Sequence, residues 1–193
     1  MGRENKSRYA VMGMLTLQPM SGYDLKKLTE ISIDNFWQEN YAQIYPILKQ
    51  LAEEGLAVKH TEKQEGRPER SIYALTEMGQ QALQKWLAEP AEDQVERHEL
   101  LLKLFFGVQV PLSVCIEHVR SYREKQVRTL ETYEQTESAV IKRYEPNTNV
   151  PYWRIALNYG RHHTRAVIAW CDETLLALKE CEEQEALLAT KND

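Results

Sequence analysis

The chain has 193 residues, of which 42% are hydrophobic and 27% are charged, and its formal net charge at pH 7 is −5. These values are ordinary for a soluble globular protein with one large or two small domains. No apolar run approaches the ~20 residues of a membrane span, and the N-terminus lacks the apolar run of a secretory signal, so we expect a cytoplasmic protein without a membrane partner.

Three helices are predicted in the first third of the chain. The segment RYAVMGMLTL, residues 8–17, is almost continuously apolar and predicts a buried helix. The letters SGYD, residues 21–24, have the form of a capping box at the start of a second helix. The segment NYAQIYPILKQLAEEGL, residues 40–56, predicts a third helix, with Asn40 as its N-cap and Gly55 just past its end.

A hairpin is predicted after these helices. Residues 56–58 and 71–75 are typical of strands, and the charged loop EGRPER, residues 65–70, joins them. Thr76 then opens a fourth helix that runs to about Ala88. Three helices, a hairpin and a helix in this order predict a winged helix-turn-helix with a two-stranded wing.

The second half of the chain is predicted to be entirely helical. The boundary is Glu89-Pro90-Ala91, and the expected helices cover residues 95–106, 111–144 and 152–189. At 1.5 Å per residue the middle helix is a rod of ~50 Å. Its apolar stripe is too long for so small a domain to bury, which favours a homodimer over an intramolecular helix pair.

The predicted fold class is therefore mainly α. Residues 1–88 form a winged helix-turn-helix DNA-binding domain, and residues 92–189 form an all-α domain for dimerisation and effector binding. Residues 1–86 hold 11 basic and 11 acidic side chains, so net charge alone does not indicate a nucleic-acid partner, although a local basic patch still could.

Enzymes and metal proteins are the rival classes. The sequence contains no GxSxG, phosphate-binding loop, HExxH or dinucleotide motif, so we expect no catalytic site and no cofactor. Five histidines and three cysteines are present, but none has the close spacing of metal ligands. His162 and His163 are adjacent and so point about 100° apart on a helix, which is poor geometry for a shared site.

Several motifs together carry a family resemblance. "SGYDL", "NYAQIYPILKQLAEEGL", "EGRPERSIYALTEMGQQAL" and the last helix, which contains Trp170, resemble the PadR family of bacterial transcriptional regulators over essentially the whole chain. The long C-terminal region resembles the larger subfamily, which includes the phenolic-acid repressor and a related virulence activator. The resemblance implies a homodimeric repressor on an inverted-repeat promoter operator. Two alternatives are an activator and a winged-helix protein-interaction module that does not bind DNA.

In a winged helix, one helix enters the major groove of double-stranded DNA and the hairpin tip lies by the adjacent minor groove. Gln43 can form a pair of hydrogen bonds with adenine. Arg67 is presented on a Gly-Pro corner to phosphates or to the groove floor. For Tyr23 and Tyr45, simple packing is an open alternative. The expected DNA contacts are Lys6, Ser7, Tyr23, Tyr41, Gln43, Tyr45, Lys49, Arg67 and Arg70.

Members of the PadR family bind small, often aromatic, effectors, and the resemblance implies such a partner here. An aromatic pocket with a few polar groups fits a phenolic or planar ligand. Core or dimer packing is the alternative use of the same side chains. The candidate effector-binding residues are Phe36, Trp37, Tyr159, His162 and His163.

Overall fold

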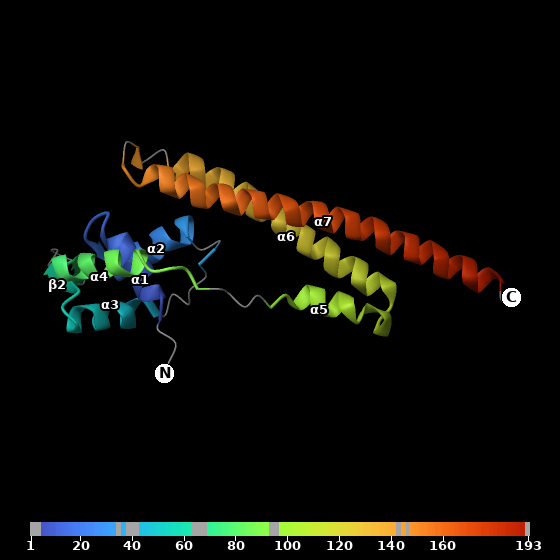
Figure 1. Ribbon diagram of the computed structural model, residues 1–193, viewed down its shortest axis with the longest axis horizontal. Coiled ribbons are helices and arrows are strands. Elements are labelled where there is room, and N and C mark those ends of the chain that lie inside the picture. Colours follow the sequence, from blue (N-terminus) through green and yellow to red (C-terminus); the bar gives the residue numbers. More distant parts are fainter. Residues whose placement is uncertain are drawn as a thin grey trace. The chain divides into compact units, whose positions relative to one another are not determined.

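The chain divides into two compact units, Met1–Asp93 and Gln94–Asp193. Figure 1 shows the winged-helix elements in the first unit and further helices in the second. The computed structural model describes, apart from the side chains of 139–140 and 185–191, residues 5–33, 36–37, 43–62, 69–92, 97–141, 144–145 and 147–191.

The N-terminal unit has the predicted order of elements, and the winged helix-turn-helix prediction is confirmed. The elements are α1 (Ser7–Leu15), β1 (Met20–Ser21), α2 (Gly22–Ser32), α3 (Ile44–Glu53), β2 (Ala57–Glu62), β3 (Arg70–Leu75) and α4 (Glu77–Leu87).

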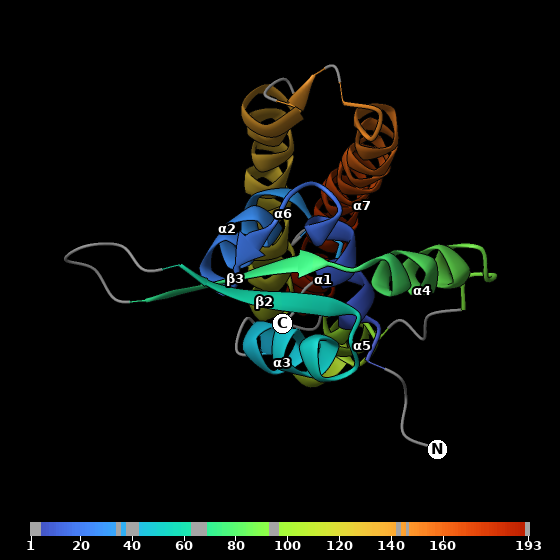
Figure 2. The same ribbon diagram turned by 90° about the vertical axis from the view of Figure 1, so that its left-hand side faces the viewer.

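Strands β2 and β3 form the predicted two-stranded wing, and the short strand β1, which was not predicted, extends the antiparallel sheet in the order β1-β3-β2. Met20 of β1 is opposite Tyr73 of β3, and the hairpin register runs from Ala57↔Leu75 to Glu62↔Arg70. Figure 2 shows β2 and β3 side by side. With two residues, β1 is too short to display the alternation by which a strand is recognised in a sequence.

Local chemistry fixes the start of α2 and the end of α3. The Asp24 amide donates to Ser21 Oγ at 3.2 Å, and the Ser21 amide donates to Asp24 Oδ2 at 3.1 Å, which completes the predicted capping box. After α3, Gly55 has φ +72° and the Leu56 amide donates to the Leu51 carbonyl at 2.8 Å, as in a Schellman motif. The predicted N-cap Asn40 lies outside the described residues.

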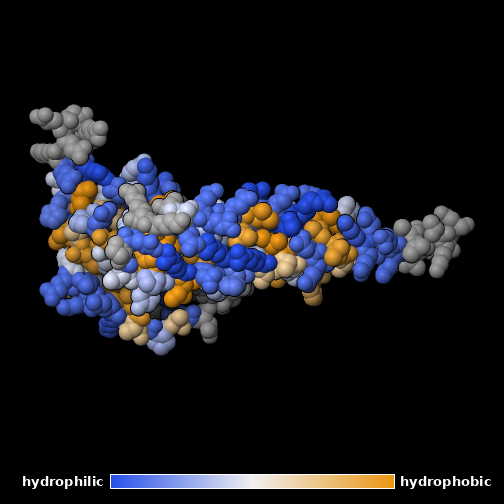
Figure 3. All heavy atoms as spheres, turned by 90° about the horizontal axis from the view of Figure 1, so that it is seen from above, coloured by the Kyte–Doolittle hydropathy of each residue, from blue (hydrophilic) through white to orange (hydrophobic). Residues whose placement is uncertain are grey.

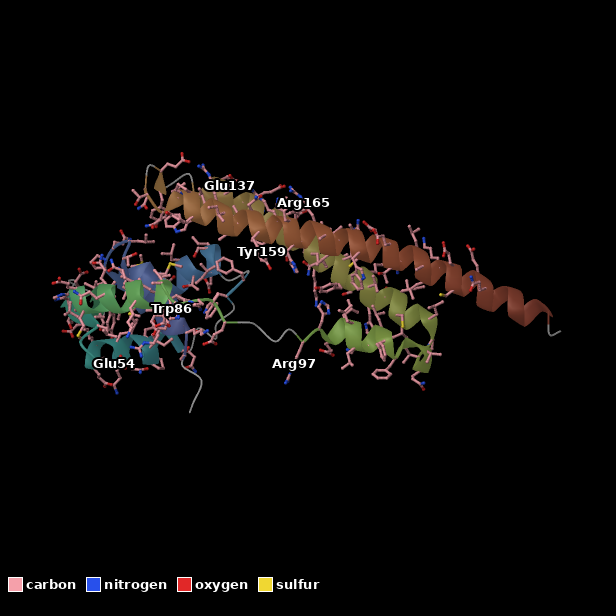
Figure 4. All side chains as sticks on the ribbon, viewed as in Figure 1. Glu54, Trp86, Arg97, Glu137, Tyr159 and Arg165 are labelled. Carbon is pink, nitrogen blue, oxygen red and sulfur yellow. The ribbon has the colours of Figure 1, made fainter. Side chains whose placement is uncertain are left out.

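One hydrophobic core holds the N-terminal unit together. Its residues come from all four helices of the unit, and they include Val11, Met12, Leu15, Leu25, Leu48, Leu51 and Leu83. Beside this core, Trp86 of α4 stacks on Tyr9 of α1 with ring centres 4.4 Å apart (Figure 4). The core therefore fixes α2 and α3, the elements of the predicted DNA-reading surface, to a shared support.

The second unit is a helical assembly around one long antiparallel pair. Its elements are α5 (Glu99–Phe105), η2 (Gly107–Gln109), α6 (Leu112–Thr136), η3 (Glu137–Ile141) and α7 (Val150–Lys191). Helices α6 and α7 pack against each other in opposite directions (Figure 1). Gly160 allows this close approach, because a Cβ there would lie 2.5 Å from the ring of Tyr133.

Two helix boundaries differ from the sequence prediction. The expected start at Val95 lies outside the described residues, but residues 97–98 are not helical, because the His98 ring accepts the Leu101 amide and caps α5. The long helix does not continue uniformly to Tyr144, since α6 gives way to the π-helical segment η3 at Glu137. There the Ser138 hydroxyl donates to backbone carbonyls of the preceding turn, which competes with regular helical bonding.

Candidate nucleic-acid interface

The start of α2 forms the first part of the candidate interface. Tyr23, its second residue, is 55% exposed, and the Lys27 ammonium lies 4.7 Å from the centre of the Tyr23 ring. A hydrogen bond with Tyr23 raises the pKa of Lys27, so this side chain remains cationic. An aromatic ring and a cation thus stand beside the N-terminal amides of a helix, an arrangement that suits a phosphate group.

Helix α3 separates into a buried side and an exposed side. The apolar residues that hold it in the core are Ile44, Ile47, Leu48 and Leu51. Gln43, Tyr45 and Lys49, the three contacts predicted for this helix within the described residues, are all exposed. The spacing of apolar residues along the sequence therefore predicted the exposed side of the helix.

Tyr45 of α3 also contacts the start of α2. A Cβ on Gly22 would lie 2.6 Å from Cε1 of Tyr45, so the ring rests directly on the backbone of the first residue of α2. The same ring is 60% exposed. Packing and exposure, the two alternatives for Tyr45, are both present, and the contact brings Tyr45 into the same part of the surface as Tyr23.

Arg70, the first residue of β3, reaches the start of α2 from the other side. Its guanidinium forms an ion pair with Asp24 and donates to Ser21 Oγ at 3.0 Å. Burial raises the pKa of Asp24, but the hydrogen bonds with Ser21 and the charge of Arg70 outweigh this effect and lower the pKa overall. Arg70 was predicted to contact DNA, and the structure places its charge on a carboxylate of its own chain.

The other predicted contacts are more scattered. Lys6 Nζ lies 2.8 Å from Glu92 Oε2, so its charge is paired within the N-terminal unit. Ser7 is 2% exposed, and the structure places it in the core and not with the surface groups. Tyr41 and Arg67 lie outside the described residues.

Trp37, one of the candidate effector residues, lines a small cavity in the N-terminal unit. The cavity has a volume of about 20 Å³, and Ser7 and Thr29 also line it. That volume has room for a water molecule but not for an aromatic acid. Within the described part of the chain, the buried Trp37 Nε1 has no hydrogen-bond partner. Phe36, the neighbouring candidate, is 50% exposed.

The remaining candidate effector residues lie on α7, in the other unit. Tyr159 is 68% exposed and projects from α7 (Figure 4). Its ring is stacked on His163, with centres 6.2 Å apart and planes at 13°. His162 is exposed as well. The predicted effector residues thus form two separate aromatic groups, one in each unit.

Two features of the interface were missed at the sequence level. Lys27 follows Tyr23 by four residues, and this spacing places both on one face of a helix, so the sequence did contain a signal for it. The link between Asp24 and Arg70 joins residues 46 positions apart, and no local pattern reveals such a pair.

The described residues show neither a metal site nor a membrane span. Among the described residues, no three His, Cys, Asp or Glu side chains group in a way that could hold a metal ion. None of the helices, as far as they are described, is both long and apolar enough to span a bilayer.

Comparison with protein families gives two matches along the chain. Residues 11–85 match the transcriptional regulator PadR-like family. Residues 96–179 match the virulence activator alpha C-terminal domain. The two matches follow one another without overlap, one in each compact unit.

Two relatives are described as transcriptional regulators and not as enzymes. The chain is 36% identical over 101 residues to the negative transcriptional regulator PadR of Bacillus subtilis, a match that covers 51% of this chain and 55% of that protein. The chain thus spans about half the length of that relative. It is 26% identical over 185 residues to the probable transcriptional regulator Rv1176c of Mycobacterium tuberculosis, covering 89% of this chain and 97% of that protein.

Solved structures share the fold over nearly the whole length. Bacillus subtilis PadR in complex with operator DNA has a TM-score of 0.76 at 23% identity, covering 89% of this chain and 98% of that chain. The same protein in complex with p-coumaric acid has a TM-score of 0.70 at 22% identity, with the same coverage. The chain therefore carries a PadR-like transcriptional regulator domain in its first half and a virulence activator alpha C-terminal domain in its second half.

Proposed function

We propose that the chain is a cytoplasmic, homodimeric repressor that binds an inverted-repeat operator in the promoter of its target genes. The observation that carries this proposal is the grouping of Tyr23, Lys27 and Tyr45 around the start of α2, next to the exposed side of α3. The fold shared with a PadR–operator complex supports it, as does the name of the Bacillus relative, a negative regulator. Residues 1–88 contact DNA in this proposal, and residues 92–189 dimerise.

Helix α3 enters the major groove in this arrangement. Gln43, at its start, reads an adenine edge, and Lys49 neutralises a phosphate nearly two turns further on. The hydroxyls of Tyr23 and Tyr45 hold phosphates at the groove edge. Lys6, Tyr41 and Arg67 are proposed as further contacts. Ser7 is omitted because it is buried.

The dimer is proposed from the apolar surface of the second unit. Helix α5 has no buried residue within its own chain, although most of its side chains are apolar. Figure 3 shows hydrophobic atoms at the surface along the helical unit. Monomers rarely expose so large an apolar surface, so we assign it to a second copy of the chain. The exposed apolar residues of α5 and its flank are Leu101, Leu102, Phe105, Phe106 and Val108.

An aromatic acid is the proposed effector. The Bacillus protein that shares this fold binds p-coumaric acid. On this chain, Tyr159 and His163 offer a stacked pair of rings, and His162 offers a polar partner for a carboxylate. In the other unit, the exposed Phe36 is the proposed aromatic group, and Trp37 is omitted because the cavity that it lines is too small for an aromatic acid.

The proposal is tested by measuring how tightly this chain binds a DNA duplex from the promoter of its own gene. Titration at several salt concentrations should give a log affinity that falls linearly with log salt, because phosphate contacts release counterions. Absence of binding at low ionic strength would refute the DNA-binding role.

Added p-coumaric acid should release the duplex, and continued binding would exclude this acid as the effector. Deletion of the gene should raise transcription from that promoter, whereas a fall would identify an activator.

A further inference from the structure

We infer that Arg70 is a positioning residue, which fixes the wing to the start of α2 through Asp24 and Ser21 and does not hold a phosphate. The inference deepens the proposed function and rests on it, since the wing is there a DNA-contacting element. It concerns three described residues whose contacts are all within one unit.

The position of Arg70 in the hairpin makes it effective as an anchor. It is the first residue of β3 and pairs with Glu62, the last residue of β2, so it lies at the end of the described part of the hairpin. Two residues further along the strand, Ile72 pairs with Ser21 of β1. Residues 70 and 72 face the same side of the strand, and this brings the Arg70 side chain over the start of α2.

The Asp24 carboxylate joins two structures. It accepts the Ser21 amide at 3.1 Å and the Ser21 hydroxyl at 2.8 Å, and it also accepts the Arg70 guanidinium. The cap of α2 and the anchor of the wing therefore use the same carboxylate oxygen, Oδ2. The ring of Tyr45, from α3, packs on the backbone of Gly22, the residue before Tyr23. Three DNA-facing elements thus meet at the four residues 21–24.

Loss of the anchor should free the wing and leave the fold intact. The side chains of Arg70 and Asp24 are 41% and 38% exposed, and ion pairs at such exposure contribute little to the free energy of unfolding. The pair should instead limit the motion of the hairpin end. An experiment can therefore distinguish a loss of hairpin positioning from a loss of overall stability.

Hydrogen exchange of the DNA-free protein is the first measurement. In Arg70→Gln and Asp24→Asn, the amides of residues 60–62 and 70–72 should exchange about tenfold faster than in the unmodified chain, while core amides of α1 and α3 keep their rates. Asp24→Glu preserves both the charge and a capping-box residue and should keep the slow rates. Arg120→Gln removes an equivalent exposed pair, with Glu117 on α6, and should change nothing at the hairpin. Unchanged hairpin exchange in Arg70→Gln overturns the inference.

Affinity for the promoter duplex is the second measurement. Arg70→Gln and Asp24→Asn should each weaken binding by about tenfold, the double variant should be no weaker than either single variant, and the salt slope should stay constant. If Asp24→Asn binds as tightly as the unmodified chain while Arg70→Gln loses about one unit of slope, Arg70 holds a phosphate and the inference is wrong. If the unmodified chain does not bind the duplex, the proposed function fails, and hydrogen exchange alone still decides whether the anchor exists.

Discussion

Gly79 shows how a single residue can fix the approach of two elements. A Cβ on this residue would lie 2.1 Å from the Leu56 carbonyl oxygen, which also accepts the Thr76 amide at 3.0 Å. The Thr76 hydroxyl donates to the Gly55 carbonyl at 2.8 Å and accepts the Gly79 amide at 3.1 Å. The end of α3 and the start of α4 are therefore tied together at a point with no room for a side chain.

Replacement of Gly79 by alanine should therefore destabilise the protein. We expect Gly79→Ala to lower the free energy of unfolding by about 2–3 kcal/mol, because backbone atoms cannot move aside as a flexible side chain can. Urea denaturation followed by circular dichroism measures the change. Gly13→Ala is the matched control: a Cβ there meets nothing within 4 Å, and the same substitution in a helix should stabilise by about 0.5–1 kcal/mol. Equal effects at the two positions would contradict the steric argument.

At the level of elements, the sequence was informative where a local signal marks the start or the end of a helix. The cap at Ser21 and the glycine at Gly55 were predicted and are present, as was the helix that follows Thr76. These signals depend on side chains and backbone groups within four residues of one another, so they can be read along the chain.

Other elements depend on partners distant in sequence and could not be predicted. Strand β1 exists because β3 supplies its hydrogen bonds. The change from α6 to η3 coincides with Glu137, which pairs with Arg154 and Arg161 of α7. For the candidate interface, the exposed side chains of α3 followed from spacing, whereas the contact of Tyr45 with Gly22 required the fold.

The recognition role of α3 can be tested with two exposed residues of the same helix. Gln43→Ala should relax preference at one defined base pair, with a loss of discrimination of about 1–3 kcal/mol, because a bidentate contact to adenine is removed. Lys49→Ala should weaken binding to all sequences alike, since a phosphate carries no base identity. Selection of binding sites from a random duplex library measures both. An unchanged site preference in Gln43→Ala would show that another residue reads the base.

For the whole molecule, exposed apolar side chains and not net charge distinguish the two proposed tasks. The entire net charge of −5 belongs to residues 87–193, whereas residues 1–86 are balanced. The unit Met1–Asp93 also contains Glu89, Glu92 and Asp93, so its net charge is −3 and that of Gln94–Asp193 is −2, and net charge does not distinguish the two units. The second unit instead exposes the apolar side chains of α5, and Phe105 is 81% exposed.

Dimerisation through α5 can be tested by placing a charge on this surface. Phe105→Glu should weaken the dimer by about 2 kcal/mol or more, because a carboxylate would be buried against a second apolar surface. Sedimentation equilibrium measures the association constant, and promoter binding should weaken in parallel. Met78→Glu changes a 51% exposed apolar residue in the other unit and should leave association unaltered. A fully dimeric Phe105→Glu would place the interface elsewhere.

The π-helical segment η3 affects which insertions and deletions this chain can accept. Its backbone hydrogen bonds join residues i and i+5, so each hydrogen-bonded loop contains one residue more than in α6. A single deletion between Glu137 and Ile141 would convert it to ordinary α-helix and leave the facing direction of the preceding α6 side chains unchanged. A deletion within α6 would instead rotate all later side chains of that helix by about 100° and turn the face that packs on α7 away from it.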